Sequence, residues 1–600
     1  MLIRLVLRAE RTGTGVSTDD GRIERAKLAQ PMSGPSTCRI CSGSLELLYP
    51  GTDSGARADA FSPSCHTPGA HGDLYRCDDC GTVQQPSLPV GPDLHELYRD
   101  MSDAAYLEEA AGRRATANRL LDMVGRYRAG GRLLDVGCGH GLLTDEAQKR
   151  GWEAIGIELS ASAAAYARDN LGLDVRQQTL DEVDPGDGFD AIVMADVIEH
   201  LDDPGAAIDR CHDLLAPDGV LLVVTPDPSS LTARIAGARW WGYLPAHTYL
   251  LPRHTLRELL SARGLVISED VAFVRSFSAR YWVSGLAERG GTIGKAATAL
   301  TTAIPRKAQL SLPLGDERVI LAHKVTTQKP ADPLVKDRGH DGKVHVVLPA
   351  YRAAETVARV AHEMPVPAAD RALLVDDASP DDTVQAALRE GFDVLRHPKN
   401  RGYGANQKTC YVRAALDGAD VVVMVHADNQ YDPALVAKMV RPILDGEADV
   451  VIGSRMLEDE SIAGGMPRWK WIGNRFLTEI ENRAFRRRYS EYHTGYRAFS
   501  TDFLRRAAFL RNNDGFVFDQ QIFAQIVAHD ARVVELAIPT RYFLEASSVS
   551  FRTSVWYGLR TLAVLTRFRL DQTGRWRWAL LRRPAARLEA RDPQAERSAR

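Results

Sequence analysis

Residues 132–141 read RLLDVGCGHG, and this stretch decides the fold of the first half of the chain. Apolar residues lead directly into glycines at alternate positions, Gly137, Gly139 and Gly141. The apolar run predicts a buried strand. The glycines predict a tight turn, because a residue without a Cβ atom lets the backbone approach a ligand closely. A helix that begins at such a turn presents free N–H groups, so we expect a nucleotide-type ligand here.

The segments after this turn alternate between strand-like apolar runs and helix-like amphipathic runs as far as residue 226. A second series of the same kind begins with KVHVVLPAY at 343–351 and continues with LLVDDASPDDT at 373–383. Alternation of this kind predicts a parallel sheet with helices on both faces. The two series share no sequence repeat. We therefore expect two different α/β enzymes fused in one chain.

Changes in composition suggest where the domains begin and end. The segment before the second series is polar, contains Pro and Gly and lacks any pattern, which is typical of a linker. We expect a disordered extension over 1–35, a zinc-ribbon-like segment over 36–96, the first α/β domain over 97–326, the linker over 327–342, the second α/β domain over 343–570 and a basic, frayed tail over 571–600.

The overall composition limits the classes of function. The 600 residues are 44% hydrophobic and 26% charged, with a net charge of −3, which argues against bulk nucleic-acid binding. No apolar run reaches the roughly 18–20 residues that a membrane-spanning helix needs. The first ten residues, MLIRLVLRAE, are too short and too charged for a secretory signal. We expect a cytoplasmic protein, with peripheral membrane contact as an open alternative.

Four cysteines form two C-x2-C pairs, CRIC and CDDC, which contain Cys38, Cys41, Cys77 and Cys80. Thiolates spaced in this way bind one tetrahedral Zn²⁺ ion from two tight turns, so the pattern predicts a structural zinc site. The alternative is a site that has kept its thiols and lost its metal. Cys65, His66 and His71 lie between the pairs and are more often solvated loop residues than replacement ligands.

The first α/β series resembles the class I S-adenosylmethionine-dependent methyltransferases. The resemblance rests on LLDVGCGHG, GIELS, FDAIVMADVIEHLDDP and LLAPDGVLLVVTP and extends over about residues 97–326. It implies a Rossmann-like seven-stranded sheet that binds S-adenosylmethionine. The implied cofactor residues are Asp135, Gly137, Gly139 and Gly141 around the methionine part, Glu158 on the ribose, Thr179 and Leu180 near the adenine, and Asp196. A plain surface carboxylate is the alternative for Glu158.

Two histidines follow the fourth and fifth strands of this series, where the carboxyl ends of the strands meet substrate. His200 lies in DVIEHL and His247 in WWGYLPAHTYLLPRH. Because histidine titrates near neutral pH, either one suits a base that removes a proton from the methyl acceptor. A structural role for His200 is the alternative. The aromatic residues around His247 suggest an acceptor pocket or the core of a lid.

In the second series, carboxylates and a tyrosine follow successive strands, in PAYRAAETV, VDDASPDDT and VHADNQYDP. Together with HPKNRGYGANQKTCY, VVIGSR and YHTGYRAF, these stretches resemble family 2 glycosyltransferases of the GT-A fold, and the polyprenyl- or dolichyl-phosphate sugar transferases among them. The resemblance implies that Pro349, Tyr351, Asp376 and Asp377 bind the nucleoside. It also implies that Asp428 binds a divalent cation that bridges the donor diphosphate.

The second half departs from this family at several positions. His426 replaces the first acid of the usual Asp-x-Asp and favours Mn²⁺ over Mg²⁺. Glu491 stands where an aspartate is common, and Gln521 stands where many relatives have an acid. Asp519 is therefore the candidate base for an inverting transfer. The stretch SVWYGLRTLAVLTRFRL, followed by GRWRWALLRRPAAR, has the mixture of Arg, Trp and Leu of an interfacial helix, or of a packed helix with a basic tail.

Taken together, the sequence predicts a bifunctional enzyme of glycan or glycolipid biosynthesis. One half would methylate a sugar or small molecule, and the other would transfer a sugar from a nucleotide donor to a lipid phosphate or glycan. The alternatives are an active methyltransferase with a non-catalytic glycosyltransferase-like domain, and a nucleotide-binding scaffold.

Overall fold

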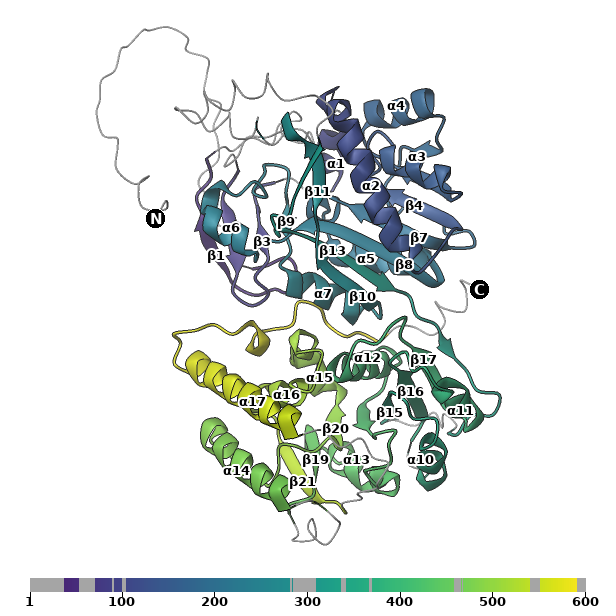
Figure 1. Ribbon diagram of the computed structural model, residues 1–600. Helices are drawn as coiled ribbons and strands as arrows, with labels where there is room; N and C mark the ends of the chain where they lie inside the picture. Colours follow the sequence, from purple (N-terminus) through teal and green to yellow (C-terminus); the bar gives the residue numbers. More distant parts are fainter. Residues whose placement is uncertain are drawn as a thin grey trace, which may run out of the picture. The chain divides into compact units, whose positions relative to one another are not determined.

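Figure 1 shows the computed structural model of the chain, in which the first half contains one large sheet and the second half another. The structure describes residues 37–52, 71–88, 91–99, 104–280, 283, 309–335, 342–365, 369–457, 466, 468–539 and 551–590. The expected extension over 1–35, together with Cys65 and His66, lies outside these residues. No helix in the described part is long and apolar enough to cross a bilayer.

The first half contains the seven-stranded sheet that the sequence predicts, in the order β10-β13-β8-β7-β4-β5-β6. The strands are β4 (Arg132–Val136), β5 (Glu153–Ile157), β6 (Val175–Arg176), β7 (Phe189–Ala195), β8 (Leu215–Pro226), β10 (Val266–Ala272) and β13 (Glu317–His323). β4 to β8 run parallel, while β13 is antiparallel to both β8 and β10. The helices are α1 (Pro92–Arg99), α2 (Ala110–Gly125), α3 (Leu142–Lys149), α4 (Ala161–Leu171), α5 (Pro204–Leu214), α6 (Leu231–Ala236) and α7 (Arg253–Ala262). A separate hairpin pairs β11 (Arg275–Ser278) with β12 (Gln309–Leu312).

Local sequence signals explain where these helices begin. Gly137, Gly139 and Gly141 all have positive φ angles, between +54° and +78°, which side chains rarely tolerate. The turn that they form leads into α3. The hydroxyl of Ser160 accepts a hydrogen bond from the backbone N–H of Ala163, which caps α4. Asp203 caps α5 in the same way.

The cysteine segment forms a small sheet with a strand from the first α/β half. β1 (Leu45–Tyr49), β2 (Leu74–Cys77), β3 (Val83–Gln84) and β9 (Tyr249–Leu250) lie in that order. Because β9 follows α6 in the chain, this segment is built into the first α/β half and is not a separate appendage. Trp240, Tyr243 and Leu250 are buried beneath it.

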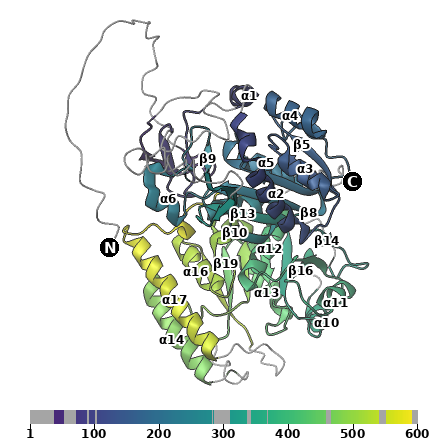
Figure 2. The ribbon, with the colours of Figure 1, turned by 45° about the horizontal axis from the view of Figure 1, so that its top comes forward.

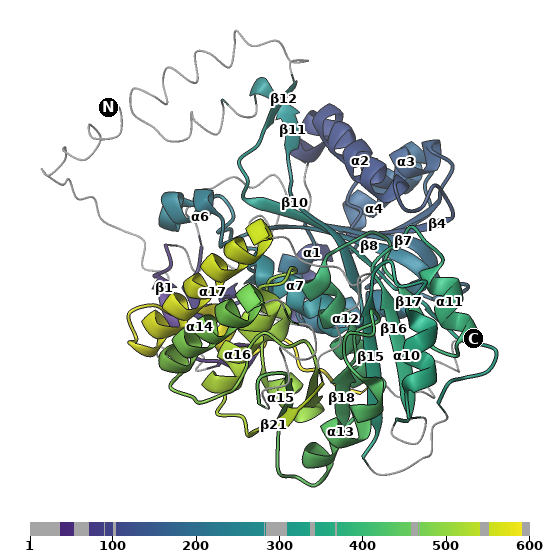
Figure 3. The ribbon, with the colours of Figure 1, turned by 60° about the horizontal axis from the view of Figure 1, so that its bottom comes forward.

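The second half contains an eight-stranded mixed sheet in the order β14-β17-β16-β15-β18-β20-β19-β21. Its strands β15 to β18 are labelled in Figure 3. The strands are β14 (Thr327–Gln328), β15 (Val344–Ala350), β16 (Arg371–Asp376), β17 (Asp393–Arg396), β18 (Val421–Met424), β19 (Val450–Ser454), β20 (Arg497–Ser500) and β21 (Val533–Ala537). β15 to β18 run parallel, while β20 is antiparallel to β18 and β19. The predicted linker 327–342 therefore starts inside this sheet, because β14 pairs with β17.

The helices of the second half are α10 (Val357–Glu363), α11 (Thr383–Arg389), α12 (Tyr403–Leu416), α13 (Val436–Leu444), α14 (Arg468–Phe485), α15 (Thr501–Arg506), α16 (Phe518–Ala528) and α17 (Phe551–Gln572). The long helices α14 and α17 lie side by side (Figures 1 and 2). Their exposed residues include large apolar side chains: Trp469, Ile472 and Phe476 on α14, and Trp556, Leu559 and Leu562 on α17.

The start of the tail, which the sequence predicts to fray, is ordered as far as residue 590. It contains a single turn at Ala579–Leu581 and buries Leu580, Leu581 and Leu588. This turn packs against α16 and against helix η7 (Phe509–Arg511), which composition alone does not reveal. Arg511 donates hydrogen bonds to the carbonyl oxygens of Ala579 and Arg583 at 2.5 and 2.8 Å.

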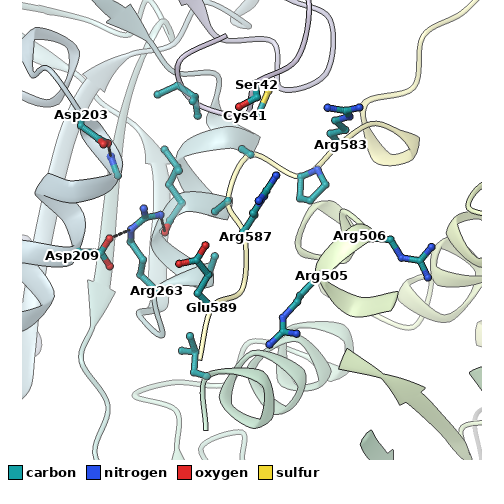
Figure 4. Close-up of a pocket in the computed structure, with 18 of the residues that line it drawn as sticks. Cys41, Ser42, Asp203, Asp209, Arg263, Arg505, Arg506, Arg583, Arg587 and Glu589 are labelled. Atoms are coloured by element: carbon teal, nitrogen blue, oxygen red, sulfur yellow. Dashed lines mark hydrogen bonds and ion pairs between the residues drawn. The ribbon is translucent and has the colours of Figure 1, made fainter. Parts of the chain in front are cut away.

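A basic cleft of about 940 Å³ lies beside this tail (Figure 4). Its lining includes Arg583 and Arg587 from the tail, Arg263 from the C-cap of α7 and Arg505 from α15. Arg263 is paired with Asp209, its Nε lying 2.9 Å from the carboxylate. Two arginines of the tail itself are also paired within the protein, Arg577 with Asp78 and Arg582 with Asp571.

Candidate active sites

The four predicted zinc ligands lie together. Sγ of Cys38 is 3.7 Å from that of Cys80, and Sγ of Cys41 is 3.4 Å from that of Cys77. All four sulfur atoms lie within 4.8 Å of one another. Thiolates about 2.3 Å from a tetrahedral Zn²⁺ are separated by roughly 3.8 Å, so the donor set fits this metal. His71 is buried, its Nδ1 atom bonds to the carbonyl of Gly72, and it does not belong to the cluster of four sulfur atoms.

The glycine turn and Glu158 form one unit. Glu158 is buried, and its two carboxylate oxygens accept hydrogen bonds from the N–H groups of Gly139 and Ser160, both at 2.8 Å. Burial raises the pKa of this carboxyl group, and the backbone N–H groups oppose that shift. Each carboxylate oxygen keeps a second lone pair for a ribose hydroxyl. The surface-carboxylate alternative does not fit a residue buried in this way.

Asp135 lies at the end of β4 beneath the same turn. Its carboxylate accepts a hydrogen bond from the hydroxyl of Thr144 at 2.7 Å. Burial raises its pKa to about 7. Thr179 bonds to Glu182, and Leu180 is partly buried against the core. Asp196 has a positive φ of +57° and is paired with Arg275, so this turn is strained and held by an ion pair.

The two histidines named as candidate bases come together with Glu199. One ligand-type atom from each of the three residues lies within 4.8 Å of the other two. Burial lowers the pKa of His200, and it lowers that of His247 to about 3. Both imidazoles are therefore neutral at physiological pH. A Cβ atom on Gly137 would lie 2.7 Å from Val197, so this cluster adjoins the glycine turn.

The aromatic residues near His247 form a core and do not line an open pocket. Trp240, Tyr243 and Tyr249 are almost fully buried, and Trp240 packs edge-to-face against Tyr243. The indole N–H groups of Trp240 and Trp241 both donate to Asp316. Of the two possibilities that the sequence leaves open, the packed core describes these residues.

Sequence reasoning missed two features of this site. Tyr106 stacks on His140, and its hydroxyl would be 3.5 Å from a Cβ atom placed on Gly139. No motif marks it, because it comes from a short helix before the first strand of the sheet. Glu199 directly precedes His200 in DVIEHL and could have been singled out from that position.

In the second half, Asp376 and Asp377 end β16 and have different partners. The carboxylate of Asp377 accepts hydrogen bonds from the N–H groups of Arg401 and Gly402, both at 2.8 Å, which shapes the loop before α12. Asp376 is fully buried, and its Oδ1 atom has no hydrogen-bond partner within the described residues. Burial raises the pKa of Asp376. Tyr351 is half exposed after β15, and Pro349 lies within that strand beside β16.

His426 and Asp428 follow β18, as the sequence predicts. Nε2 of His426 lies 3.2 Å from the hydroxyl of Tyr403, and burial lowers the pKa of this histidine. Oδ1 of Asp428 accepts a hydrogen bond from the N–H of Gln430. A neutral imidazole and a carboxylate are donors that suit Mn²⁺, so the residues fit a divalent cation.

Asp519 lies in the first turn of α16 and is held by two donors. Its Oδ1 atom accepts hydrogen bonds from Arg497 at 2.9 Å and from Gln407 at 3.2 Å. The side chain of Gln521 accepts a hydrogen bond from the N–H of Asn513. Glu491 pairs with Arg455, and this guanidinium helps to keep its pKa low despite burial. Glu491 and Gln521 therefore have structural roles.

The comparisons with known proteins agree with this division. Residues 106–269 match the methyltransferase domain model, and residues 345–508 match glycosyl transferase family 2. A ubiquinone biosynthesis O-methyltransferase of Bradyrhizobium diazoefficiens is 34% identical over 191 residues, which cover 30% of this chain and 74% of that protein. The corresponding protein of Rhodopseudomonas palustris is 34% identical over 166 residues, which cover 26% of this chain and 66% of that one.

Two further known proteins are similar to part of this chain. An uncharacterized protein of Methanocaldococcus jannaschii is 29% identical over 223 residues, which cover 37% of this chain and 89% of that protein. Glucosyl-3-phosphoglycerate synthase from Mycobacterium tuberculosis, solved with UDP, is 18% identical over 40% of this chain and 88% of that one, with a TM-score of 0.31. The chain thus belongs with the methyltransferases in its first half and carries a glycosyl transferase family 2 domain in its second, as a fusion of the two.

Proposed function

We propose that the chain is a bifunctional enzyme of glycan or glycolipid biosynthesis. Its first half methylates an oxygen- or nitrogen-bearing small molecule or sugar, and its second half transfers a sugar with inversion to a lipid phosphate or a glycan. The observation that carries the methyl-donor half is Glu158, which is fixed by the turn that it would share with the ribose. S-adenosylmethionine supplies the electrophilic methyl group, and the protein aligns donor and acceptor.

For the methyl acceptor, we propose that His200 takes the proton. Its Nδ1 atom lies 3.0 Å from the carbonyl oxygen of Ala246, so Nδ1 carries the hydrogen and Nε2 keeps its lone pair. His247 is a weaker base, because a pKa of about 3 lies far below the working pH.

The sugar-donor half is supported by the unpartnered Oδ1 of the buried Asp376. A buried carboxylate oxygen without a partner is costly, and a base N–H of the nucleotide would satisfy it. Asp428 and His426 would hold a divalent cation, which supplies charge to the leaving diphosphate. Asp519 would take the acceptor proton through the carboxylate oxygen that Arg497 and Gln407 leave open.

Contact with a membrane surface is part of this proposal. The exposed Trp and Leu side chains of α14 and α17 give the second half an apolar face at the surface. The basic segment after α17 is a less suitable anchor than its composition predicts. Arg577 is paired with Asp78 and Arg582 with Asp571, which removes two of its charges.

The direct test uses the full chain with S-adenosylmethionine and a panel of nucleotide sugars in Mn²⁺. We expect saturable cofactor binding by calorimetry and slow hydrolysis of one donor sugar. Asp428→Ala should abolish that hydrolysis and leave cofactor binding unchanged. No donor hydrolysis by the wild-type chain, or equal hydrolysis by Asp428→Ala in chelator, would refute the sugar-transfer half of the proposal.

A further inference from the structure

The cluster of Glu199, His200 and His247 contains a buried carboxylate that the proposed proton transfer does not use. Glu199 is 1% exposed, and its Oε2 atom accepts a hydrogen bond from the hydroxyl of Thr225 at 3.0 Å. Its Oε1 atom is buried without a hydrogen-bond partner in the described part of the chain. Leaving such an atom unsatisfied is costly, so a missing positive partner is the simplest physical explanation.

Both histidines are oriented by carbonyl oxygens. Nδ1 of His247 lies 2.7 Å from the carbonyl of Gly242, and Nδ1 of His200 lies 3.0 Å from that of Ala246. The hydroxyl of Tyr98 also lies 2.7 Å from Nδ1 of His200, and a hydroxyl can accept as well as donate. A carbonyl oxygen only accepts hydrogen bonds, so each Nδ1 carries the hydrogen and each Nε2 has a free lone pair. Histidines that bind metals are commonly held in this tautomer by a carbonyl behind the ring.

We propose that Glu199, His200 and His247 bind a divalent first-row transition-metal ion, such as Zn²⁺, Mn²⁺ or Fe²⁺, beside the methyl-donor turn. Two imidazoles and one carboxylate favour these ions over Mg²⁺ or Ca²⁺, which prefer oxygen ligands. The three ligand atoms lie within 4.8 Å of one another. Ligands about 2.0–2.2 Å from a tetrahedral ion are roughly 3.4 Å apart, which lies within this limit.

The position of the cluster places the ion close to the turn that would bind the methyl donor. Glu199 and His200 lie in the short helix η3 (Ile198–His200), directly after Val197, which adjoins Gly137 of the donor turn. Three protein ligands leave coordination positions open, so an oxygen of the methyl acceptor can bind there and lose its proton to water more readily. This role of the ion depends on the proposed methyl transfer, whereas binding of the ion does not depend on it. When the ion is bound, Nε2 of His200 holds it and the acceptor proton goes to water, so the role of base proposed above for His200 applies only to the protein without the ion.

The test counts metal ions on the full-length protein, first stripped and then titrated with Co²⁺. Every protein in this test carries Asp428→Ala, which removes the cation site proposed for the sugar-donor half. We expect two equivalents. One is the Cys₄ site, which gives a sulfur-to-cobalt charge-transfer band, and the other gives only weak visible bands from nitrogen and oxygen ligands. In Glu199→Gln and in His247→Gln, the second equivalent should bind at least about 10-fold more weakly, while the sulfur band stays unchanged. His212→Gln, which removes a histidine from α5, is the matched control and should keep both equivalents.

Each outcome decides the proposal. A single equivalent in the Asp428→Ala protein, or two equivalents in both of its further variants, would overturn it and leave Glu199 as a buried protonated acid. Burial does raise the pKa of Glu199 well above its usual range, so protonation is the real competitor. If the second ion binds normally but no methyl transfer is found, the proposed function fails and the metal site stands.

Discussion

Arg511 is the side chain whose removal should most clearly disturb the packing of the tail. Its Nε lies 2.8 Å from the carboxylate of Glu258 in α7, and the two side chains are 2% and 1% exposed. The same guanidinium donates to the carbonyl of Asp79 at 3.0 Å. Arg511→Met keeps most of the length of the side chain, but it leaves the Glu258 carboxylate buried without its cation. Removing one member of a buried ion pair costs about 3–5 kcal/mol.

The readout for Arg511→Met is native-state hydrogen exchange at the amide of Ala585, which donates to Glu258 at 2.9 Å. A global unfolding curve would be ambiguous, because a chain of this size does not unfold in two states. We expect the free energy of opening at this amide to fall by about 3–5 kcal/mol, a factor of roughly 10²–10³·⁵ in exchange rate. Arg441→Met, which removes an exposed pair with Asp445, should change it by less than about 1 kcal/mol.

The loss in Arg511→Met should also depend on pH. Burial raises the pKa of Glu258 even with Arg511 present, and the cation opposes that shift. Without Arg511, the folded-state pKa rises further above the unfolded value, so the neutral acid is the form that folding favours. The stability deficit should therefore be small at pH values below the unfolded pKa and should grow as pH rises through the folded pKa. An opening energy within about 1 kcal/mol of wild type at pH 8 would refute this reasoning.

Three further predictions address the cofactor sites. Glu158→Ala should weaken S-adenosylmethionine binding by about 1.5–3 kcal/mol, measured by calorimetry, and Gly139→Val should weaken it at least as much because of its positive φ; unchanged affinity in both variants would contradict the assignment. Purified protein should contain about one tightly bound zinc per chain at the cysteines, and Cys77→Ser should lower it in elemental analysis; four freely titrating thiols in the wild type would rule it out. Asp519→Asn should keep donor binding and lower sugar transfer at least about 10²-fold, with inverted product in the wild type; a retained anomeric configuration would exclude its role as base.

Much of the fold could be predicted from the sequence because the central strands are mainly apolar and are separated by strong turn residues. For example, β4 leads directly into the glycine turn, and β16 ends in a buried aspartate. The tail could not be predicted, because Leu580 and Leu588 become core residues only through contact with segments distant in the sequence. For the same reason, composition did not distinguish the aromatic core around Trp240 from a pocket.

The same distinction between predictable and unpredictable features applies to the candidate sites. The sequence predicts that Asp376, Asp377 and Glu158 lie at the ends of strands, because the motifs fix these positions in an α/β sheet. The sequence does not predict the groups that hydrogen-bond to these carboxylates. Arg401, Gly402 and Ser160 donate through their backbone N–H groups, and any residue can do so. Arg497, which holds Asp519, is a buried cation and carries no local sequence signal of that role.

The contact between Ala585 and Glu258 joins residues 327 positions apart in the chain, and it constrains the order of events during synthesis. Domains usually fold as they leave the ribosome, starting with the N-terminal one. Here the first half cannot complete the surroundings of α7 until the last described residues have been made. Until then, a buried carboxylate and its apolar neighbours stay open to water and to other chains. Premature termination near residue 570 should therefore give a first half that is prone to aggregation, even though every residue of its own sheet is present.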